Sequence, residues 1–472
     1  MDEKLFGILE RFQPCFSRVV SYQWFVVIMI GLVVRADHYG VSSIVRWLSL
    51  TPGCYWTMLH FFHSTGWTLE GLRWCWWSYC FQDTPCLKVQ GRAVMVGDHT
   101  NQPKEGRKMP GLVTIHQDSE TSSKPSYYRG HVWCFIALVV ERAQKCFAVP
   151  LLGELDRDEV NKKDGHSKAT RIVYQAIRIA EKMNCPCYLN LDSYFAVGPV
   201  FLLAAGTYSV VARAPWVHII THAKKNTVAY MDPEPTPPGK RGPKKKYGKK
   251  LTLNNLFTER ASEFVETTCC VYGDTELVKI LCLDLFWKPI KGKIRFVLAI
   301  TSRGPIVLMC SDLALSAVQV LELYCRRASI ENMFWVLKNL IGGLAYHFWS
   351  KLIEKKSRRP QKNKGSHSSA QKVPVTAVED KLRAIEGFVN LSGILIGILQ
   401  ILALQFPEQI WKDNQHWLRT FSNKVPSEYI VKGVLTQTIL GNLHKVNAHA
   451  IYGLIRSRQS QPCDFQQLKR AA

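Results

Sequence analysis

Acidic residues are scarce in this chain. Asp and Glu total 37 of the 472 residues, against 61 Lys and Arg, so the formal net charge is +24. A surplus of this size is typical of proteins that bind polyanions, and we expect nucleic acid or an anionic membrane surface as the partner. The hydrophobic fraction of 47% excludes a mostly disordered chain. The length predicts two or three structural units.

Paired CxxC modules are absent, although the chain has 15 cysteines. The nearest approaches to a cluster are Cys185-Pro-Cys187 and Cys269-Cys270. A zinc site needs cysteines at regular short spacings, which this scattered and odd-numbered set does not provide. We interpret the cysteines as reduced thiols and expect a cytoplasmic protein, with a zinc site as the alternative.

Long apolar runs are also few. The run at residues 25–34 comes late, lacks a small-residue cleavage site and is too short to span a bilayer, which argues against a signal peptide or an anchor there. The run at residues 388–406 nearly reaches spanning length. Four polar residues interrupt it: Asn390, Ser392, Gln400 and Gln405. The pattern favours a buried core helix and no membrane partner, with a membrane anchor as the alternative.

Residues 1–88 are predicted to be helical and are unusually aromatic. Thr51-Pro52 is a good helix start, and the break at residues 63–68 separates two helices. Four tryptophans stand close together: Trp67, Trp74, Trp76 and Trp77. We consider two interpretations: a helix-turn-helix that binds DNA, or a helical hairpin whose tryptophans form a core.

From residue 89 the pattern changes to alternating strands and helices. Expected strands lie at 92–98, 131–140, 146–155, 187–192 and 208–213, with helices at 167–184 and 199–205. This order predicts an α/β unit, residues 89–213, built on a mixed sheet with both faces covered. Strand 92–98 ends in Asp98 and strand 187–192 ends in Asp192. Neighbouring strand ends can bring these two carboxylates together.

The remaining chain is expected to form four further segments. Residues 214–312 are predicted as a β-rich insertion, with strands at 293–301 and 305–310 and a basic loop. Residues 313–350 hold a helix that completes the α/β unit, 351–378 a basic linker, and 379–472 a helical C-terminal region. The basic loop contributes five lysines that we expect to contact DNA: Lys244, Lys245, Lys246, Lys249 and Lys250.

The expected helix around residues 324–338 carries more charge than a core helix should. On an ideal helix, Tyr324, Arg327, Glu331 and Lys338 share a narrow arc beside an apolar seam. One acid among bases suits phosphodiester chemistry, because the carboxylate can hold a metal while the bases hold phosphates. With Asp98 and Asp192, Glu331 would make a three-carboxylate magnesium site. The alternative is an ordinary solvated helix face.

The spacing of these four residues, Y-(2)-R-(3)-E-(6)-K, resembles the signature of a large group of bacterial insertion-sequence transposases, the IS-four-like DDE family. Segments 96–111, 189–201, 243–250 and 323–339 are similar to that family in the same order. The resemblance spans about residues 90–350. One departure is the segment after Asp192, where Tyr194 stands at a position that is glycine in many members, and this leaves the roles of Tyr194 and Phe195 open.

The resemblance implies an RNase H-like catalytic domain interrupted by the β-rich insertion. It implies that Asp98, Asp192 and Glu331 are a DDE triad holding two Mg²⁺ or Mn²⁺ ions, and that Tyr324, Arg327 and Lys338 contact DNA phosphates. The expected function is a DNA transposase that cleaves the ends of its element and joins the 3′-hydroxyls to target DNA. We expect double-stranded DNA as substrate, a homodimer, and a bacterial, nucleoid-associated location. The alternatives are an inactive or accessory DNA-binding protein of this fold and a general nuclease.

Overall fold

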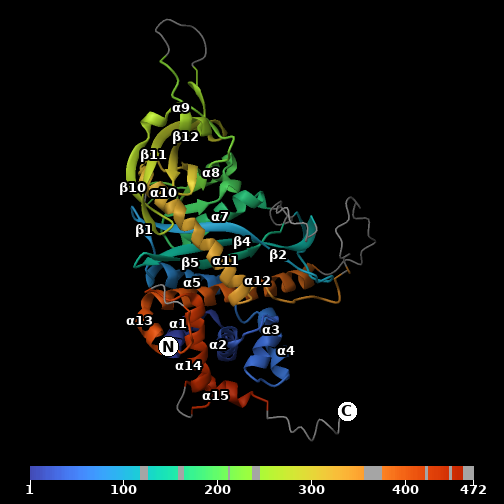
Figure 1. Ribbon diagram of the computed structural model, residues 1–472. Helices are drawn as coiled ribbons and strands as arrows, with labels where there is room; N and C mark the ends of the chain where they lie inside the picture. The colour runs from blue at the N-terminus through green and yellow to red at the C-terminus, as the bar shows by residue number, and fades with distance from the viewer. Residues whose placement is uncertain are drawn as a thin grey trace.

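A central mixed sheet with helices on both faces organises the protein (Figure 1). The computed structural model describes residues 1–116, 126–157, 164–210, 213–235, 245–353, 355, 375–419, 424–445 and 449–460. Its described strands join into one sheet with the order β3-β4-β2-β6-β7-β13-β12-β11-β8-β9. Strands β5, β1 and β10 pair with β4, β2 and β11 respectively. The α/β class and the mixed sheet predicted from the sequence are confirmed.

The centre of the sheet consists of three parallel strands: β2 (Arg92–Pro103), β6 (Cys187–Leu191) and β7 (Val217–His222). Their apolar residues are fully buried, as the inner strands of a sheet covered on both faces require. Strand β4 (Tyr127–Arg142) pairs antiparallel with β2, and β3 (Val113–His116) and β5 (Lys145–Leu155) pair antiparallel with β4. The two-residue strand β1 (Lys88–Val89) pairs with the start of β2.

Two details of the predicted strands are wrong. The strand expected at 208–213 does not form in its described part, residues 208–210 and 213, and residues 211–212 lie outside the described residues. Ser209 makes an isolated bridge with Ala214 and Val210 is exposed, whereas the run that pairs with β6 is β7. Both runs are short and apolar, so only the pairing with β6 distinguishes them. Strand β2 also continues five residues past Asp98, because the long strand β4 pairs with it as far as Pro103.

The strands after β7 continue the same sheet. They are β8 (Val228–Tyr230), β9 (Lys250–Thr252), β10 (Val265–Val271), β11 (Asp274–Trp287), β12 (Gly292–Thr301) and β13 (Gly304–Cys310). Strand β13 pairs with β7 on one side and with β12 on the other. Short helical turns connect them: η3 (Leu253–Asn255), α9 (Leu256–Glu259), η4 (Ala261–Glu263) and η5 (Lys288–Ile290).

Different helices cover the two faces of the central strands. Helix α7 (Lys168–Lys182) lies against the face to which Gly97 belongs, and a Cβ atom at Gly97 would stand 2.7 Å from Ile172. Helix α8 (Gly198–Ala205) packs beside α7. The opposite face receives α11 (Ser329–Trp335), whose Phe334 meets Phe135 of β4 at 5.6 Å between ring centroids. Side chains alternate along a strand, so Asp98 faces α11.

The two ends of the chain form one helical layer below the sheet, where blue and red helices lie side by side in Figure 1. The N-terminal helices are α1 (Asp2–Glu10), η1 (Gln13–Cys15), α2 (Val19–Val34), α3 (Gly40–Trp47), α4 (Gly53–His63) and α5 (Leu69–Gln82). The C-terminal helices are α12 (Val375–Gln405), α13 (Pro407–Asp413), α14 (Glu428–Leu443) and α15 (Ala450–Ser457).

The N-terminal tryptophans mostly serve as core residues. Trp67, Trp76 and Trp77 are buried, while Trp74 is exposed. The indole N–H groups of Trp76 and Trp77 donate to the carbonyl oxygens of Pro150 and Leu151 on β5. Helix α5 is therefore fixed to the sheet, which favours the hairpin interpretation of this cluster over exposed recognition tryptophans.

Helix α12 is long and apolar enough to cross a membrane, yet its most apolar stretch is wholly buried inside the protein. It packs against β5, α2, α4 and α14. Its interrupting polar residues have partners: the Asn390 amide bonds to the backbone of Gly153, and Gln405 donates to the carbonyl oxygen of Asp83. The predicted core helix therefore forms, and it begins at Val375, before the expected residue 379.

Candidate active site

The strand register places the first two predicted carboxylates next to each other. In the parallel pair of β2 and β6, the last matched residues are Val96 and Asn190. Two residues further on, Asp98 and Asp192 stand at the same level of the sheet. Because the residue two positions along a strand returns to the same face, both carboxylates belong to the face covered by α11.

Asp98 is held in a crowded, water-poor position. Its side chain is 15% exposed, and its Oδ1 accepts a hydrogen bond from the backbone N–H of His99 at 2.7 Å. Burial and the nearby carboxylates of Asp192 and Glu331 raise the pKa of Asp98 to about 7, against the opposing effect of Arg327. Burial contributes most to this rise, and the neighbouring carboxylates add negative charge that a cation would relieve.

Asp192 directly follows β6 and begins the short helical turn η2 (Ser193–Phe195). Its Oδ1 accepts from the Tyr194 N–H at 3.0 Å, and its backbone carbonyl accepts from Thr221 Oγ1 on β7. These bonds fix the turn that carries the aspartate. They also place Phe195 in the core and leave Tyr194 exposed, so the two aromatic residues after Asp192 differ in environment.

Glu331 comes from a series of helical turns rather than from one regular helix. The series is α10 (Ala317–Cys325), the 3₁₀ turn η6 (Arg326–Ala328), α11, and the π-helical turn η7 (Val336–Leu340). A capping box of Ser316 and Gln319 starts it. Arg326 anchors η6 to the sheet through a bidentate pair with Glu141 of β4. Such changes of helical type re-aim the side chains that follow, so the narrow arc expected for an ideal helix is only approximate.

Arg327 connects the sheet carboxylate with the helix carboxylate. Its Nη1 donates to Asp98 Oδ2 at 3.1 Å and to Glu331 Oε1 at 3.5 Å. Glu331 itself is 59% exposed, while Arg327 is 20% exposed. The guanidinium thus stands between two of the three predicted carboxylates and partly neutralises them.

The other two residues of the charged stripe border the same region. Tyr324 is buried in α10, which raises its pKa to about 12, and its ring centroid lies 6.3 Å from that of His222. Lys338 Nζ donates to the carbonyl oxygen of Asn101 on β2 at 3.2 Å. Lys338 therefore reaches the part of β2 that lies beyond Asp98.

The donor chemistry of this site fits a hard divalent cation. Asp98, Asp192 and Glu331 offer carboxylate oxygens, the ligands that Mg²⁺ and Mn²⁺ prefer. In the part of the chain that the structure describes, no trio of His, Cys, Asp or Glu side chains surrounds a common ion position in this conformation. Because Arg327 lies between Asp98 and Glu331, these two carboxylates would have to release it before sharing an ion.

Two residues near the carboxylates were not singled out from the sequence. His99 follows Asp98 and stacks on Phe195 with ring centroids 5.3 Å apart, and burial lowers its pKa. Asn190 is fully buried, and within the described residues neither side-chain atom has a hydrogen-bond partner. It precedes Asp192 by two residues on the same face. The sequence signal that could have identified Asn190 is its polar side chain in an apolar strand, two residues before the predicted Asp192.

Five other acids in the sequence are rival candidates to Asp98 and Asp192: Asp118, Glu120, Glu154, Asp156 and Asp158. Glu154 receives hydrogen bonds from Arg171 and Gln175, and Asp156 pairs with Lys168 at 2.9 Å. Acids spaced two residues apart after a strand are usually solvated in a loop, but Glu154 and Asp156 fix α7 to β5 as structural ion pairs. The other competing acids, Asp118, Glu120 and Asp158, lie outside the described residues.

The predicted lysine cluster lies far along the sheet from Asp98. Lys250 begins β9, the last strand of the sheet order, and Lys245, Lys246 and Lys249 precede it on exposed chain. Lys244 lies outside the described residues. The structure therefore does not bring these lysines to the carboxylates, and any interaction of theirs with DNA would be made at a distance from them.

Comparison with known proteins gives one family match. The sequence profile described as DDE superfamily endonuclease matches residues 11–264, more than half of the chain. The matched segment contains Asp98 and Asp192 and ends before Glu331. A search of curated proteins gives no match. Two aspartates on adjacent parallel strands, faced by a helix with a glutamate and basic residues, agree with this match, and we conclude that the chain belongs to the DDE superfamily endonucleases.

Proposed function

We propose that this endonuclease is a DNA transposase of the IS-four-like group, with an RNase H-like catalytic domain. The observation that carries the proposal is the register of β2 and β6, which sets Asp98 beside Asp192 on the face where α11 presents Glu331. The spacing of Tyr324, Arg327, Glu331 and Lys338 supports the same group. DNA as the substrate follows from the family and agrees with the net charge of +24.

In this proposal Asp98, Asp192 and Glu331 would hold two Mg²⁺ or Mn²⁺ ions. Such ions, when bound, polarise the phosphodiester and promote deprotonation of the attacking oxygen. Arg327 and Lys338 would hold phosphates next to the scissile bond, with Arg327 leaving the carboxylates for the DNA. Burial of Asp98 on one side of the site keeps water from competing for its oxygens.

The reaction proceeds in two displacements of the same type. Water attacks a phosphodiester at the end of the element, which breaks the bond to the 3′ oxygen and releases a 3′-hydroxyl. That hydroxyl then attacks a phosphodiester of the target DNA, so one bond forms as another breaks. No covalent intermediate with the protein is needed. Pairing two element ends would require at least two copies of the chain.

The test uses labelled DNA that contains the native borders of the gene, with Mg²⁺ or Mn²⁺ and without either. We expect metal-dependent cuts at a fixed border and joining of the released 3′ ends to a second DNA. Glu331→Gln should keep folding and DNA binding but lose cutting by at least about 100-fold, as removal of a metal carboxylate does. Glu322→Gln, on α10 and away from the carboxylates, is the matched control and should retain activity.

The other outcomes separate the alternatives. Cutting without preference for the border and without joining would identify a general nuclease. Binding without cutting, in wild type and variant alike, would identify a DNA-binding protein whose charged helix only grips phosphates. Full cutting by Glu331→Gln would remove Glu331 from the site.

A further inference from the structure

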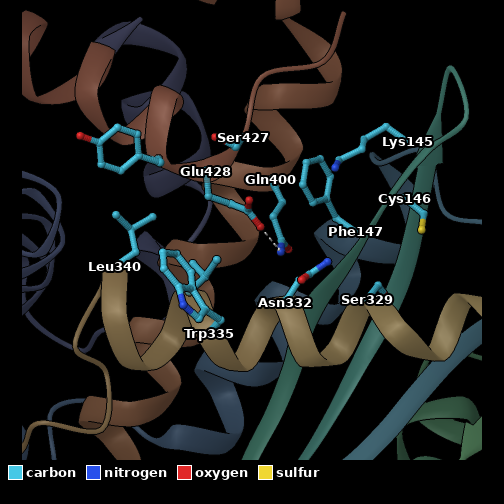
Figure 2. A pocket seen from close by; sticks show the side chains of 12 residues that line it. Lys145, Cys146, Phe147, Ser329, Asn332, Trp335, Leu340, Gln400, Ser427 and Glu428 are labelled. Atoms are coloured by element: carbon cyan, nitrogen blue, oxygen red, sulfur yellow. Dashed lines mark hydrogen bonds between the residues drawn. The ribbon is translucent and has the colours of Figure 1, made fainter. Parts of the chain in front are cut away.

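A pocket of about 330 Å³ lies between β5, α11, α12 and the start of α14 (Figure 2). Helix α11 and the turn after it contribute Ser329, Asn332 and Val336, which recur at helical spacing on one face. Glu331 and Arg327 lie on another face of the same helical series and do not line the pocket. The pocket is therefore separate from the carboxylate site, and its volume suits a small ligand or one side chain.

The inner end of the pocket is acidic and incompletely satisfied. Glu428, at the start of α14, is 7% exposed, and its Oε1 accepts a hydrogen bond from Gln400 Nε2 at 2.9 Å. Gln400 is 1% exposed, and within the described residues its Oε1 has no donor. Figure 2 shows the two side chains meeting inside the pocket, with Asn332 opposite them.

A buried carboxylate normally has a cation as partner. Among the residues that the structure describes, Glu428 has the neutral Gln400 amide as its hydrogen-bond partner instead. The Glu428 carboxylate is therefore an acceptor for a group that carries several N–H donors, and the unsatisfied Gln400 Oε1 is buried behind the amide that bonds to this carboxylate.

Part of the pocket wall is apolar and aromatic. Phe147 of β5 is buried, Leu340 is half-buried, and Trp335 is 57% exposed at the rim. Aromatic faces attract cations, and they favour planar guanidinium groups in particular. An apolar stem would replace water along Val336 and Leu340.

We propose that this pocket binds a guanidinium group carried on an apolar stem, either an arginine side chain of a protein partner or a small alkylguanidine. Guanidinium fits better than ammonium because its planar fork can donate two N–H bonds to a carboxylate such as that of Glu428 and can stack on an aromatic face. Trp335 would then cover the bound group from the solvent side.

Lys145 sets a limit on this binding. Its Nζ lies 5.4 Å from the ring centroid of Phe147, on the wall opposite Glu428, and Figure 2 shows it pointing toward that ring. Its charge repels a cationic ligand. Replacing it by methionine, which keeps the stem, should therefore tighten binding, the opposite of the effect expected for removing the charge of Glu428.

The test is calorimetric titration of the full chain with butylguanidinium and with its neutral analogue butylurea. We expect butylguanidinium to bind at least about tenfold more tightly, the effect of one charge-assisted pair. Glu428→Gln should weaken it about tenfold, Lys145→Met should tighten it, and Glu408→Gln, an exposed acid on α13, should leave it unchanged. Trp335→Ala, at an exposed position, should weaken binding without affecting folding, and it tests the site if Glu428→Gln does not fold.

Equal binding of butylurea and butylguanidinium, or no binding of either up to about 10 mM, would overturn the proposal. So would an unchanged affinity in both Glu428→Gln and Trp335→Ala. A second titration compares agmatine with a blocked Gly-Arg-Gly tripeptide. Binding of the tripeptide would identify an arginine side chain as the natural occupant, and binding of agmatine alone would identify a small alkylguanidine.

Discussion

At the scale of single residues, Arg327 has two partners that a divalent cation would also require. Its guanidinium is 20% exposed and bonds to both Asp98 and Glu331. A cation that balances buried carboxylates stabilises the fold, since an unpaired buried charge is costly. Arg327 therefore has a structural role in the metal-free protein as well as the proposed role toward DNA.

Arg327→Ala should lower the stability of the metal-free protein by about 1–3 kcal/mol, because Asp98 no longer has its charged partner. Added Mg²⁺ or Ca²⁺ should recover more of the melting temperature in the variant than in wild type, since Arg327 no longer competes for the carboxylates. Thermal unfolding at increasing ion concentration measures both effects.

The neighbouring Arg326→Ala is the control for this prediction. Arg326 pairs with Glu141, outside the carboxylate site, so its removal should destabilise the protein without recovery by divalent ions. Equal ion-induced shifts in wild type and Arg327→Ala would contradict the shared use of the carboxylates.

At the scale of the elements, small residues decide how closely helices approach the sheet and one another. Gly397 of α12 lies against α5, and a Cβ atom there would stand 2.3 Å from Cζ2 of Trp76. Gly441 of α14 is exposed and has no neighbour within 4 Å of such an atom. A glycine-to-alanine substitution would therefore meet a packed side chain in α12 and open space in α14.

Gly397→Ala should destabilise the protein by about 1–2 kcal/mol, because crowding of Trp76 outweighs the better helix propensity of alanine. Gly441→Ala should stabilise it by up to about 1 kcal/mol, since only the propensity changes. Chemical denaturation of the two variants measures the difference. A gain in stability for Gly397→Ala would show that α12 and α5 can move apart at little cost.

At the scale of the whole molecule, the excess of positive charge is spread well beyond the carboxylate site. Lys245, Lys246, Lys249 and Lys250 stand at one end of the sheet, and the helical layer with both chain ends stands at the other (Figure 1). A long DNA substrate could contact these lysines in addition to the active site. If only the total charge of the protein mattered, lysines at either end of the molecule would contribute equally to DNA binding.

Changing Lys245, Lys246, Lys249 and Lys250 to Gln should weaken non-specific DNA binding. The slope of log affinity against log salt concentration should become shallower by about 0.9 for each phosphate that these lysines neutralise in the wild type. The matched control changes four exposed lysines of the helical layer to Gln: Lys4, Lys412, Lys424 and Lys445. Affinity measured at several salt concentrations tests both sets. If the two sets of substitutions weakened DNA binding equally, the lysines of the loop would contribute only through the total charge of the protein and would not mark a specific DNA-binding path.

Much of the central architecture could be predicted from local sequence. Strands β4, β5, β6, β12 and β13 and helices α7 and α8 lie where the apolar patterns indicated, since each pattern is read within one element. Strand β7 could not be chosen over residues 208–213, because two short apolar runs compete and only pairing with β6 selects one. The continuation of the sheet from β7 through β13 depends on pairing between distant segments and has no local signal.

The sequence by itself determined which residues we propose for the chemistry: two aspartates that follow or end apolar strand segments, and a glutamate with bases at helical spacing. Only the tertiary structure decided how they meet. The β2 and β6 register sets Asp98 level with Asp192, and Arg327, which also bonds to Glu331, reaches Asp98 across 229 residues of sequence. The physical reason is that side-chain periodicity is a local property, whereas strand register and the ion pairs across a buried interface form only when remote segments are packed together.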